Sequence, residues 1–257
     1  MKNLTLENIA RVCGGTYYGP ADKLQEEVMS VITDSRKAEE GCLFVPIVGE
    51  RVDAHKFIPQ VMEAGALATL SERVLDNADF PYIAVESSLQ AVKDIAEFYL
   101  KQLQIPVVGI TGSVGKTTTR EMISTVLDFS EEGFSDNWKP DSQIGVPLTL
   151  SHLTREDEIA VLEIGMSERG QIEKLTNMIR PNVAVVTMIG VSHIAQLKTQ
   201  ENICLEKMDI VKGLPEDGMV FLNGMTSFLH HIAVSYLIRH FSMEWIKPVI
   251  TEQRMCM

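Results

Sequence analysis

The spacing of apolar residues divides the chain into two regions of alternating helices and strands. The first region opens with a helix, because Leu6, Ile9 and Val12 recur at helical spacing before a pair of glycines. Strands are expected at 28–33, 42–47, 66–70 and 82–85, and helices at 55–64 and 88–104. Ile105-Pro106 follows the last helix and marks a boundary. The pattern therefore predicts a small α/β unit over residues 1–104.

The second region, residues 105–257, is marked by longer apolar runs. The segments 107–111, 159–164 and 183–189 are almost unbroken, which is typical of strands buried on both faces of a parallel sheet. Helices are expected between them. This order of elements predicts a mostly parallel sheet flanked by helices, so the whole chain is assigned to the α/β class.

Composition and charge narrow the possible functions. The 257 residues exceed the roughly 100–200 of one domain, which agrees with two units. Hydrophobic residues make up 45% and charged residues 23%, as in ordinary soluble domains. The net charge of -12 argues against a general affinity for nucleic acid or for an anionic membrane. Any phosphate group must therefore be bound by local features.

The cysteines and the N-terminus indicate the compartment. Cys13, Cys42, Cys204 and Cys256 are far apart and show no metal-binding spacing, so free thiols in a reducing cytoplasm are expected, and no zinc site. The N-terminus lacks the apolar core of a signal peptide, and no apolar run approaches the roughly 20 residues that span a bilayer. The sequence thus predicts a cytoplasmic protein without membrane insertion.

The strongest motif is GITGSVGKTTTREM, residues 109–122, in which a buried strand leads through a glycine-rich turn into a helix. Such a turn presents backbone N–H groups to phosphate oxygens, and the helix directs its positive end to the same place. Lys116 would reach the β- and γ-phosphates of a nucleotide, and the Thr117 hydroxyl would bind Mg²⁺. The expected nucleotide contacts are Gly112, Ser113, Val114, Gly115, Lys116, Thr117 and Thr118.

The loop is a variant, because Ile110 stands where a strict Walker A motif has its first glycine. A glycine-rich turn with an exposed lysine is the alternative interpretation.

Several segments resemble the Mur ligase family. TGSVGKTTTREM is similar to the nucleotide loop of Mur ligases and of the related folylpolyglutamate synthetases. QIGVPLTL, VLEIGMSERGQIEKL, RPNVAVVT and IGVSHI resemble the MurF type in order and spacing, and TDSRKAEEGCLFVPIVGERVDAHKFI resembles the UDP-substrate domain shared by MurF and MurE. The likeness covers residues 1 to about 223. It implies a UDP-MurNAc-binding domain over 1–104, followed by the P-loop ATPase domain over 105–257.

The resemblance also implies a reaction. Enzymes of the MurF type transfer the γ-phosphoryl group of ATP to the terminal carboxylate of UDP-MurNAc-tripeptide, and the amine of D-alanyl-D-alanine attacks the acyl phosphate. No enzyme nucleophile is needed, so catalysis rests on positioning and on charge neutralisation by lysine and Mg²⁺.

In the second region, three residues match family positions beyond the loop. Glu163 ends a buried strand, where a carboxylate is costly unless it is paired or bound to metal, and it is interpreted as an Mg²⁺ ligand or else as a structural ion pair. The resemblance makes His193 a second Mg²⁺ ligand, although a lone histidine is more often structural. Lys207 matches the lysine that is carbamylated in the family, and otherwise reads as a surface lysine. With Lys116, the residues Glu163 and Lys207 form the expected catalytic set.

In the first region, the match points to the binding of the UDP-sugar. The corresponding positions are Ser35, Arg36, Arg51, Asp53 and His55. The forked donors of arginine suit a diphosphate, and a solvated charged loop is the alternative.

The match fails at three places. Asp141-Ser142 replace a family Asn-Asn pair, Met188 replaces an asparagine, and Gly224-Met225 replace an Asp pair. The sequence is expected to diverge from about residue 224, which would leave the ATPase domain incomplete and the C-terminal ligase domain absent. Two alternatives therefore stay open: a truncated, non-catalytic remnant that binds nucleotide or UDP-sugar, and a MurE-type ligase that adds one amino acid.

Overall fold

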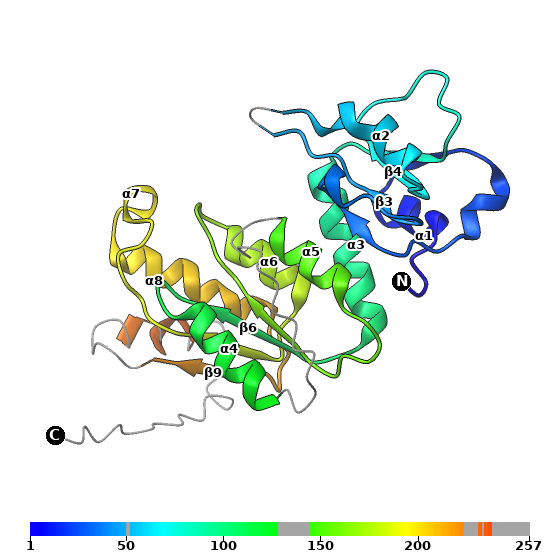
Figure 1. Cartoon of the computed structure of the whole chain (residues 1–257). Coiled ribbons are helices and arrows are strands. Elements are labelled where there is room, and N and C mark those ends of the chain that lie inside the picture. The colour runs from blue at the N-terminus through cyan, green and yellow to red at the C-terminus, as the bar shows by residue number, and fades with distance from the viewer. Residues whose placement is uncertain (50–51, 128–143, 224–230, 233, 238–257) are drawn as a thin grey trace.

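Two α/β units and one shared helix make up the computed structural model of the chain (Figure 1). The structure describes residues 1–49, 52–127, 144–223, 231–232 and 234–237. Helix α3 (Ser88–Leu103) lies between the two units. The α/β class and the mostly parallel sheets predicted from the sequence are confirmed.

The first unit contains a five-stranded sheet in the order β1-β5-β4-β3-β2. Strand β1 is antiparallel to β5, and the other pairs are parallel. The strands are β1 (Thr16–Tyr18), β2 (Val31–Ile32), β3 (Leu43–Phe44), β4 (Ala68–Ser71) and β5 (Tyr82–Ala84), and the helices are α1 (Leu6–Val12) and α2 (Ile58–Glu63). The four predicted strands are present but shorter than the apolar runs, and β1 was not predicted.

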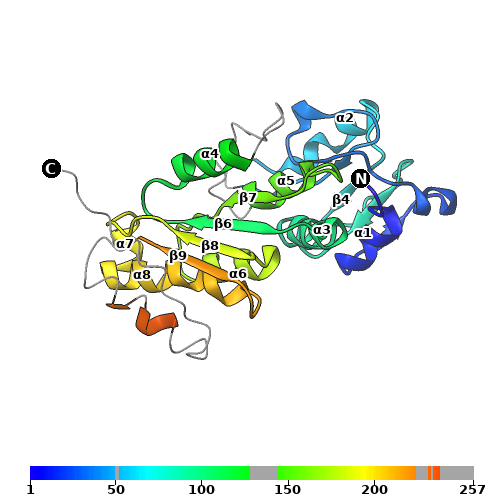
Figure 2. The ribbon, with the colours of Figure 1, turned by 90° about the horizontal axis from the view of Figure 1, so that it is seen from below.

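The second unit contains a parallel sheet in the order β7-β6-β8-β9. Its strands are β6 (Val107–Thr111), β7 (Ala160–Glu163), β8 (Val183–Val186) and β9 (Met219–Leu222). Its helices are α4 (Lys116–Leu127), α5 (Gly145–His152), α6 (Gln171–Ile179), α7 (Ile194–Leu197) and α8 (Gln200–Met208). Figure 2 shows α4 on one face of the sheet and α6 and α8 on the other. Strand β6 is buried along its whole length, as its unbroken apolar sequence predicts.

Helix α3 belongs to both hydrophobic cores. Its first half contributes Val92 and Ile95 to the core of the first unit, and its second half contributes Tyr99 and Leu100 to the core of the second. The Tyr99 hydroxyl also donates a 2.7 Å hydrogen bond to the Leu153 carbonyl at the end of α5. A boundary after residue 104 therefore leaves the second core without the residues that the C-terminal half of α3 contributes to it.

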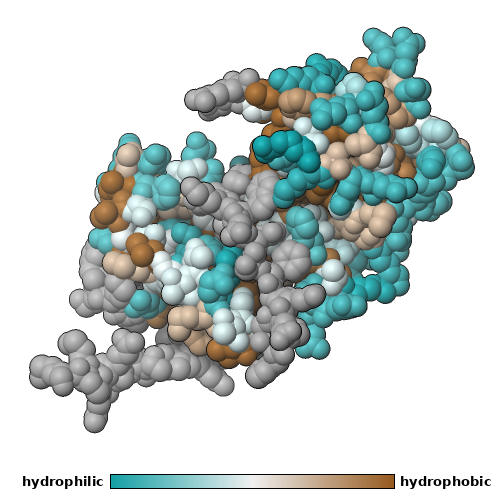
Figure 3. Space-filling view, viewed as in Figure 1, coloured by the Kyte–Doolittle hydropathy of each residue, from teal (hydrophilic) through white to brown (hydrophobic). Residues whose placement is uncertain are grey.

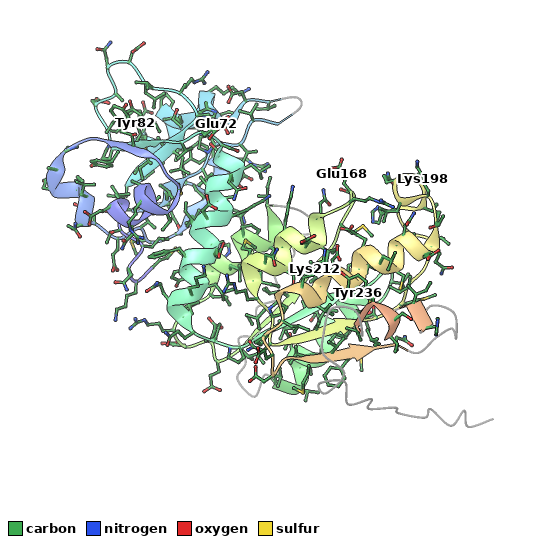
Figure 4. All side chains as sticks on the ribbon, turned by 180° about the vertical axis from the view of Figure 1, so that it is seen from behind. Glu72, Tyr82, Glu168, Lys198, Lys212 and Tyr236 are labelled. Carbon is green, nitrogen blue, oxygen red and sulfur yellow. The ribbon has the colours of Figure 1, made fainter. Side chains whose placement is uncertain are left out.

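A short helical segment from the tail packs against the second unit. Leu237 is buried in the hydrophobic core of the second unit, and the Tyr236 hydroxyl donates to the carboxylate of Asp209. Lys212 lies 3.0 Å from the same carboxylate, and the side chains of Lys212 and Tyr236 are neighbours in Figure 4. Burial and the adjacent Asp209 raise the pKa of Tyr236, so the phenol stays protonated as the donor.

Hydrophilic side chains cover much of the described surface of the first unit in Figure 3. None of the described helices is both long and apolar enough to span a membrane.

Candidate functional site

The carboxyl ends of three parallel strands meet at one edge of the second sheet. Ile110 of β6 is in register with Glu163 of β7, and Thr111 is in register with Val186 of β8. The chain runs from β6 to β7 on one side and then crosses to β8 on the other. In open α/β sheets, ligands bind beyond the carboxyl ends at such a switch point. The glycine-rich loop leaves β6 at this place.

The loop is clamped against the end of β8. Gly112 has a φ of 153°, and a Cβ atom built there would lie 1.8 Å from Oγ1 of Thr187. The backbone N–H of Ser113 donates to the Met188 carbonyl at 2.6 Å, and the Thr187 hydroxyl donates to two carbonyls of the strand end and loop at 3.2 and 2.7 Å. Gly115, with a φ of 87°, completes the turn. Glycine is required at Gly112 by both backbone conformation and space.

Two lysines converge on the base of this loop. Helix α4 begins at Lys116, whose amino group donates to the Gly112 carbonyl at 3.1 Å. The amino group of Lys207, from α8, donates to the same carbonyl at 3.0 Å, and Lys207 is only 2% exposed. The structure thus brings together two of the three predicted catalytic residues, although 91 positions separate them, and the N-terminal end of α4 adds further positive potential.

The third predicted catalytic residue, Glu163, contacts the residue that follows Lys116. Its carboxylate is 5% exposed, and Oε2 accepts a 3.1 Å hydrogen bond from the Thr117 hydroxyl. Oε1 is buried and has no hydrogen-bond partner within the described part of the chain, and Nε of Arg120 lies 3.5 Å from it. A buried carboxylate with an unsatisfied oxygen next to a hydroxyl fits a hard divalent cation such as Mg²⁺.

His193 lies in the loop after β8, at the same edge of the sheet. It has a φ of 64° and precedes α7, and the hydroxyl of the adjacent Ser192 donates to the Ser113 carbonyl at 3.4 Å. Over the described ranges, no three His, Cys, Asp or Glu side chains converge as a metal cluster. Metal ligation by His193 therefore stays a prediction.

The predicted sugar-binding residues lie around the carboxyl ends of the first sheet. Ser35 and Arg36 follow β2, and the guanidinium of Arg36 forms a fork with the carboxylate of Asp34 at 2.9 and 2.6 Å. These hydrogen bonds lower the pKa of Asp34 to about 2. Arg36 is highly exposed and still able to meet an anion, whereas Arg51 lies outside the described residues.

The buried His55 is paired with the partly exposed Asp53. Nδ1 of His55 lies 2.6 Å from the Asp53 carboxylate, and Nε2 accepts a 3.0 Å hydrogen bond from the backbone N–H of Glu72. The Glu72 carboxylate in turn accepts from the N–H of Ser88 at the start of α3 (Figure 4). Both ring nitrogens of His55 thus have partners in the chain. This geometry suits a residue that fixes the loop better than one that contacts a ligand directly.

Two arginines of these sites were not singled out from the sequence. Arg120 follows Thr117 by three residues, and the 3.6-residue period of a helix would have placed it on the same side of α4. Arg73 follows β4 and lies 3.4 Å from Asp53, a contact that depends on strand order and carries no local signal.

Comparisons with known proteins find relatives over most of the chain. Residues 110–244 match the model of the Mur ligase middle domain, a range that includes the phosphate loop and continues past residue 224. The chain is 40% identical over 222 residues, 86% of its length, to the UDP-N-acetylmuramoyl-tripeptide--D-alanyl-D-alanine ligase of Bacillus subtilis (strain 168).

Two solved structures extend the likeness to three dimensions. MurF from Acinetobacter baumannii matches with a TM-score of 0.79 and 28% identity, over 90% of this chain and 51% of that one. MurF ligase from Thermotoga maritima, solved in complex with ADP, matches with a TM-score of 0.70 and 32% identity, over 80% of this chain and 48% of that one. The chain spans about half the length of the relatives that it matches, including 48% of the Bacillus protein.

Proposed function

This chain belongs to the Mur ligase family. We propose that it acts as an ATP-dependent amide ligase of the MurF type, which joins D-alanyl-D-alanine to UDP-MurNAc-tripeptide. The observation that carries the proposal is the clamped phosphate loop, with Lys116 and Lys207 at the Gly112 carbonyl and Glu163 at the Thr117 hydroxyl. The two proposed substrates are taken from the name of the Bacillus relative.

The proposed reaction brings two anions together, the γ-phosphate of ATP and the terminal carboxylate of the tripeptide. The chain's task is to position them and to offset their charge. The loop N–H groups and the N-terminus of α4 would receive the β- and γ-phosphates, and Lys116 would leave the Gly112 carbonyl for a phosphate oxygen. The expected loop contacts also include Ser113, Val114, Gly115 and Thr118.

Mg²⁺ would be held by the Thr117 hydroxyl and the Glu163 carboxylate, with His193 as a further ligand. When bound, the ion supplies charge neutralisation at the transferring phosphoryl group. Lys207 would support this site from beneath the loop, because its charge is buried next to the Gly112 carbonyl.

The first unit would bind the UDP-sugar at the carboxyl edge of its sheet. Ser35 and the exposed guanidinium of Arg36 would meet the diphosphate, while Asp53 and His55 hold the neighbouring loop. We also propose that the protein is cytoplasmic, in keeping with the absence of a disulfide among the described cysteines Cys13, Cys42 and Cys204.

A second candidate function is the binding of nucleotide and UDP-sugar without turnover. It is supported by the two candidate sites, the clamped phosphate loop and the exposed guanidinium of Arg36, each of which would bind its ligand without a reaction. A MurE-type ligase is disfavoured, because the relative at 40% identity is named for the addition of D-alanyl-D-alanine.

The first experiment is thermal unfolding with and without Mg²⁺-ATP. Binding at a hundredfold excess over Kd adds about 2.7 kcal/mol to the free energy of unfolding. We expect this gain in the unsubstituted chain and in the Lys174→Ala control, which removes an exposed lysine of α6, but not in Lys116→Ala. The absence of any gain would reject the proposed nucleotide site. ADP release that requires both UDP-MurNAc-tripeptide and D-alanyl-D-alanine separates a ligase from the binding-only alternative.

A further inference from the structure

Arg120 is the cation that faces the buried carboxylate of Glu163. It lies on α4, one turn beyond Thr117, and its side chain is only 14% exposed. Its Nε atom lies 3.5 Å from Oε1 of Glu163, and its terminal nitrogen donates to the exposed carboxylate of Glu121. Neither the family resemblance nor the predicted reaction assigns a role to this arginine.

The two oxygens of Glu163 have different surroundings. Oε2 accepts from the hydroxyl of Thr117, the other proposed ligand of the divalent cation, whereas the unsatisfied Oε1 lies next to Arg120. A divalent cation and the guanidinium would therefore share one carboxylate. The guanidinium cannot lose its proton to relieve the repulsion, and the low exposure of both side chains weakens screening by water.

The long Arg120–Glu163 distance indicates that Glu163 can leave Arg120 and bind another cation. At 3.5 Å the contact is an ion pair without a hydrogen bond, and Glu121 provides the arginine with a second carboxylate partner. Arg120 can keep one partner when Glu163 turns toward a metal ion.

We propose that Arg120 is a positioning residue that acts as a charge gate on the metal site. Without nucleotide, it holds Glu163 and disfavours the binding of a free divalent cation. The phosphates of an arriving nucleotide bring the negative charge that offsets both cations, so the metal ion enters together with the nucleotide. This inference deepens the proposed function and rests on it.

The test measures the binding of Mn²⁺ alone to the whole chain, by the electron paramagnetic resonance signal of the free ion. We expect Arg120→Gln to bind Mn²⁺ at least about tenfold more tightly than the unsubstituted chain in the absence of nucleotide. Arg120→Lys retains the charge and should keep the weak binding. Arg155→Gln is the matched control, because it removes one exposed arginine ahead of β7 and should leave Mn²⁺ binding unchanged.

Two further measurements make the result specific. With saturating ADP, Arg120→Gln and the unsubstituted chain should differ by less than about threefold, because the phosphates offset the arginine. Adding Glu163→Gln to Arg120→Gln should abolish the tight site. Equal or weaker Mn²⁺ binding by Arg120→Gln, or the same gain in Arg120→Lys or Arg155→Gln, would overturn the proposal.

If Arg120→Gln does not fold, Glu121→Gln takes its place, because that position is exposed. Without its second partner, Arg120 should pair more fully with Glu163, and Mn²⁺ binding without nucleotide should weaken by about threefold or more. Unchanged binding would again overturn the gate. Failure of the proposed function is seen separately, as the loss of Mg²⁺-ATP stabilisation in the unsubstituted chain.

Discussion

Gly112→Ala is the sharpest perturbation of the clamped loop. The new Cβ would lie 1.8 Å from Oγ1 of Thr187, and the residue would have to keep a φ of 153°. The backbone strain costs about 1–3 kcal/mol. Relief of the overlap costs about another 1–3 kcal/mol. We therefore expect the free energy of unfolding to fall by about 2–6 kcal/mol, a large part of the 5–15 kcal/mol typical of a domain.

Gly170→Ala isolates the backbone contribution. Gly170 has a φ of 76°, but no atom lies within 4 Å of a Cβ built there, so only the left-handed conformation is penalised, by about 1–2 kcal/mol. Thr187→Ala alone removes the hydroxyl and its hydrogen bonds to the two carbonyls, at a cost of about 1 kcal/mol. The double variant Gly112→Ala/Thr187→Ala lacks the clashing oxygen. Its destabilisation should be smaller than the sum of the single effects by at least about 1 kcal/mol.

The assay is urea unfolding followed by far-ultraviolet circular dichroism, repeated with Mg²⁺-ATP. Gly112→Ala should also lose the stabilisation by nucleotide, because the loop cannot keep its shape, whereas Gly170→Ala should retain it. The reasoning is refuted if Gly112→Ala costs no more than Gly170→Ala, or if the effects of Gly112→Ala and Thr187→Ala add within about 0.5 kcal/mol.

Three further predictions concern single side chains. Lys207→Met keeps the buried volume, so the free energy of unfolding should fall by no more than about 2 kcal/mol, whereas calorimetry should show ATP affinity reduced at least about tenfold; unchanged affinity would contradict the role beneath the loop. Burial raises the pKa of Cys13 to about 12 and of Cys204 to about 11. In the Cys256→Ser variant, the remaining thiols of the native chain should react with a thiol reagent at pH 8 at least about tenfold more slowly than those of the urea-unfolded chain. Equal rates would disprove this. The pKa of Asp34 is lowered from 3.8 to about 2, so its ion pair contributes stability above about pH 4 that is lost as the pH falls toward 2. Asp34→Asn should therefore be less stable than the unsubstituted chain at pH 6 but not at pH 2, and a pH-independent difference would refute it.

The sequence predicts best the elements whose burial is uniform. The run 107–111 is strand β6 residue for residue, and the helix expected over 88–104 is α3, Ser88–Leu103. The strand expected over 28–33 shrinks to Val31–Ile32, because the N–H of Val28 donates to the Leu4 carbonyl and not to a neighbouring strand of the sheet. Buried positions are occupied by apolar residues whether or not their backbone joins a sheet, so an apolar run can be longer than the strand.

The missed strands show the reverse case. Strands β1 and β9 lie at sheet edges, have three and four residues, and alternate between exposed and half-buried positions. Met219 and Phe221 of β9 are about half exposed, so little apolar patterning marks this strand. Their pairing is decided by β5 and β8, which are distant in sequence.

In the candidate site, too, the parts that are local in sequence could be predicted and the parts that depend on packing could not. The phosphate loop is local in sequence, and its glycines and Lys116 could be recognised there. Lys207 read equally well as a surface lysine, yet it is buried under the loop because α8 packs on the face of the sheet opposite α4. The shared contact of Lys116 and Lys207 with the Gly112 carbonyl depends on the strand order, which no spacing in the sequence specifies.

Helix α3 connects the two candidate sites. At its start, the N–H of Ser88 is held by Glu72, whose backbone N–H is bound by His55, next to the proposed sugar site. At its end, the chain passes directly into β6 and the phosphate loop. Sixteen helical residues span about 24 Å, and both hydrophobic cores pack on this one rod. The proposed reaction requires that a carboxylate at the far end of an extended UDP-sugar peptide reach the γ-phosphate of ATP. A continuous helix between the proposed sugar site and the phosphate site would set the reach that this substrate needs, so its length would select which carboxylate arrives there.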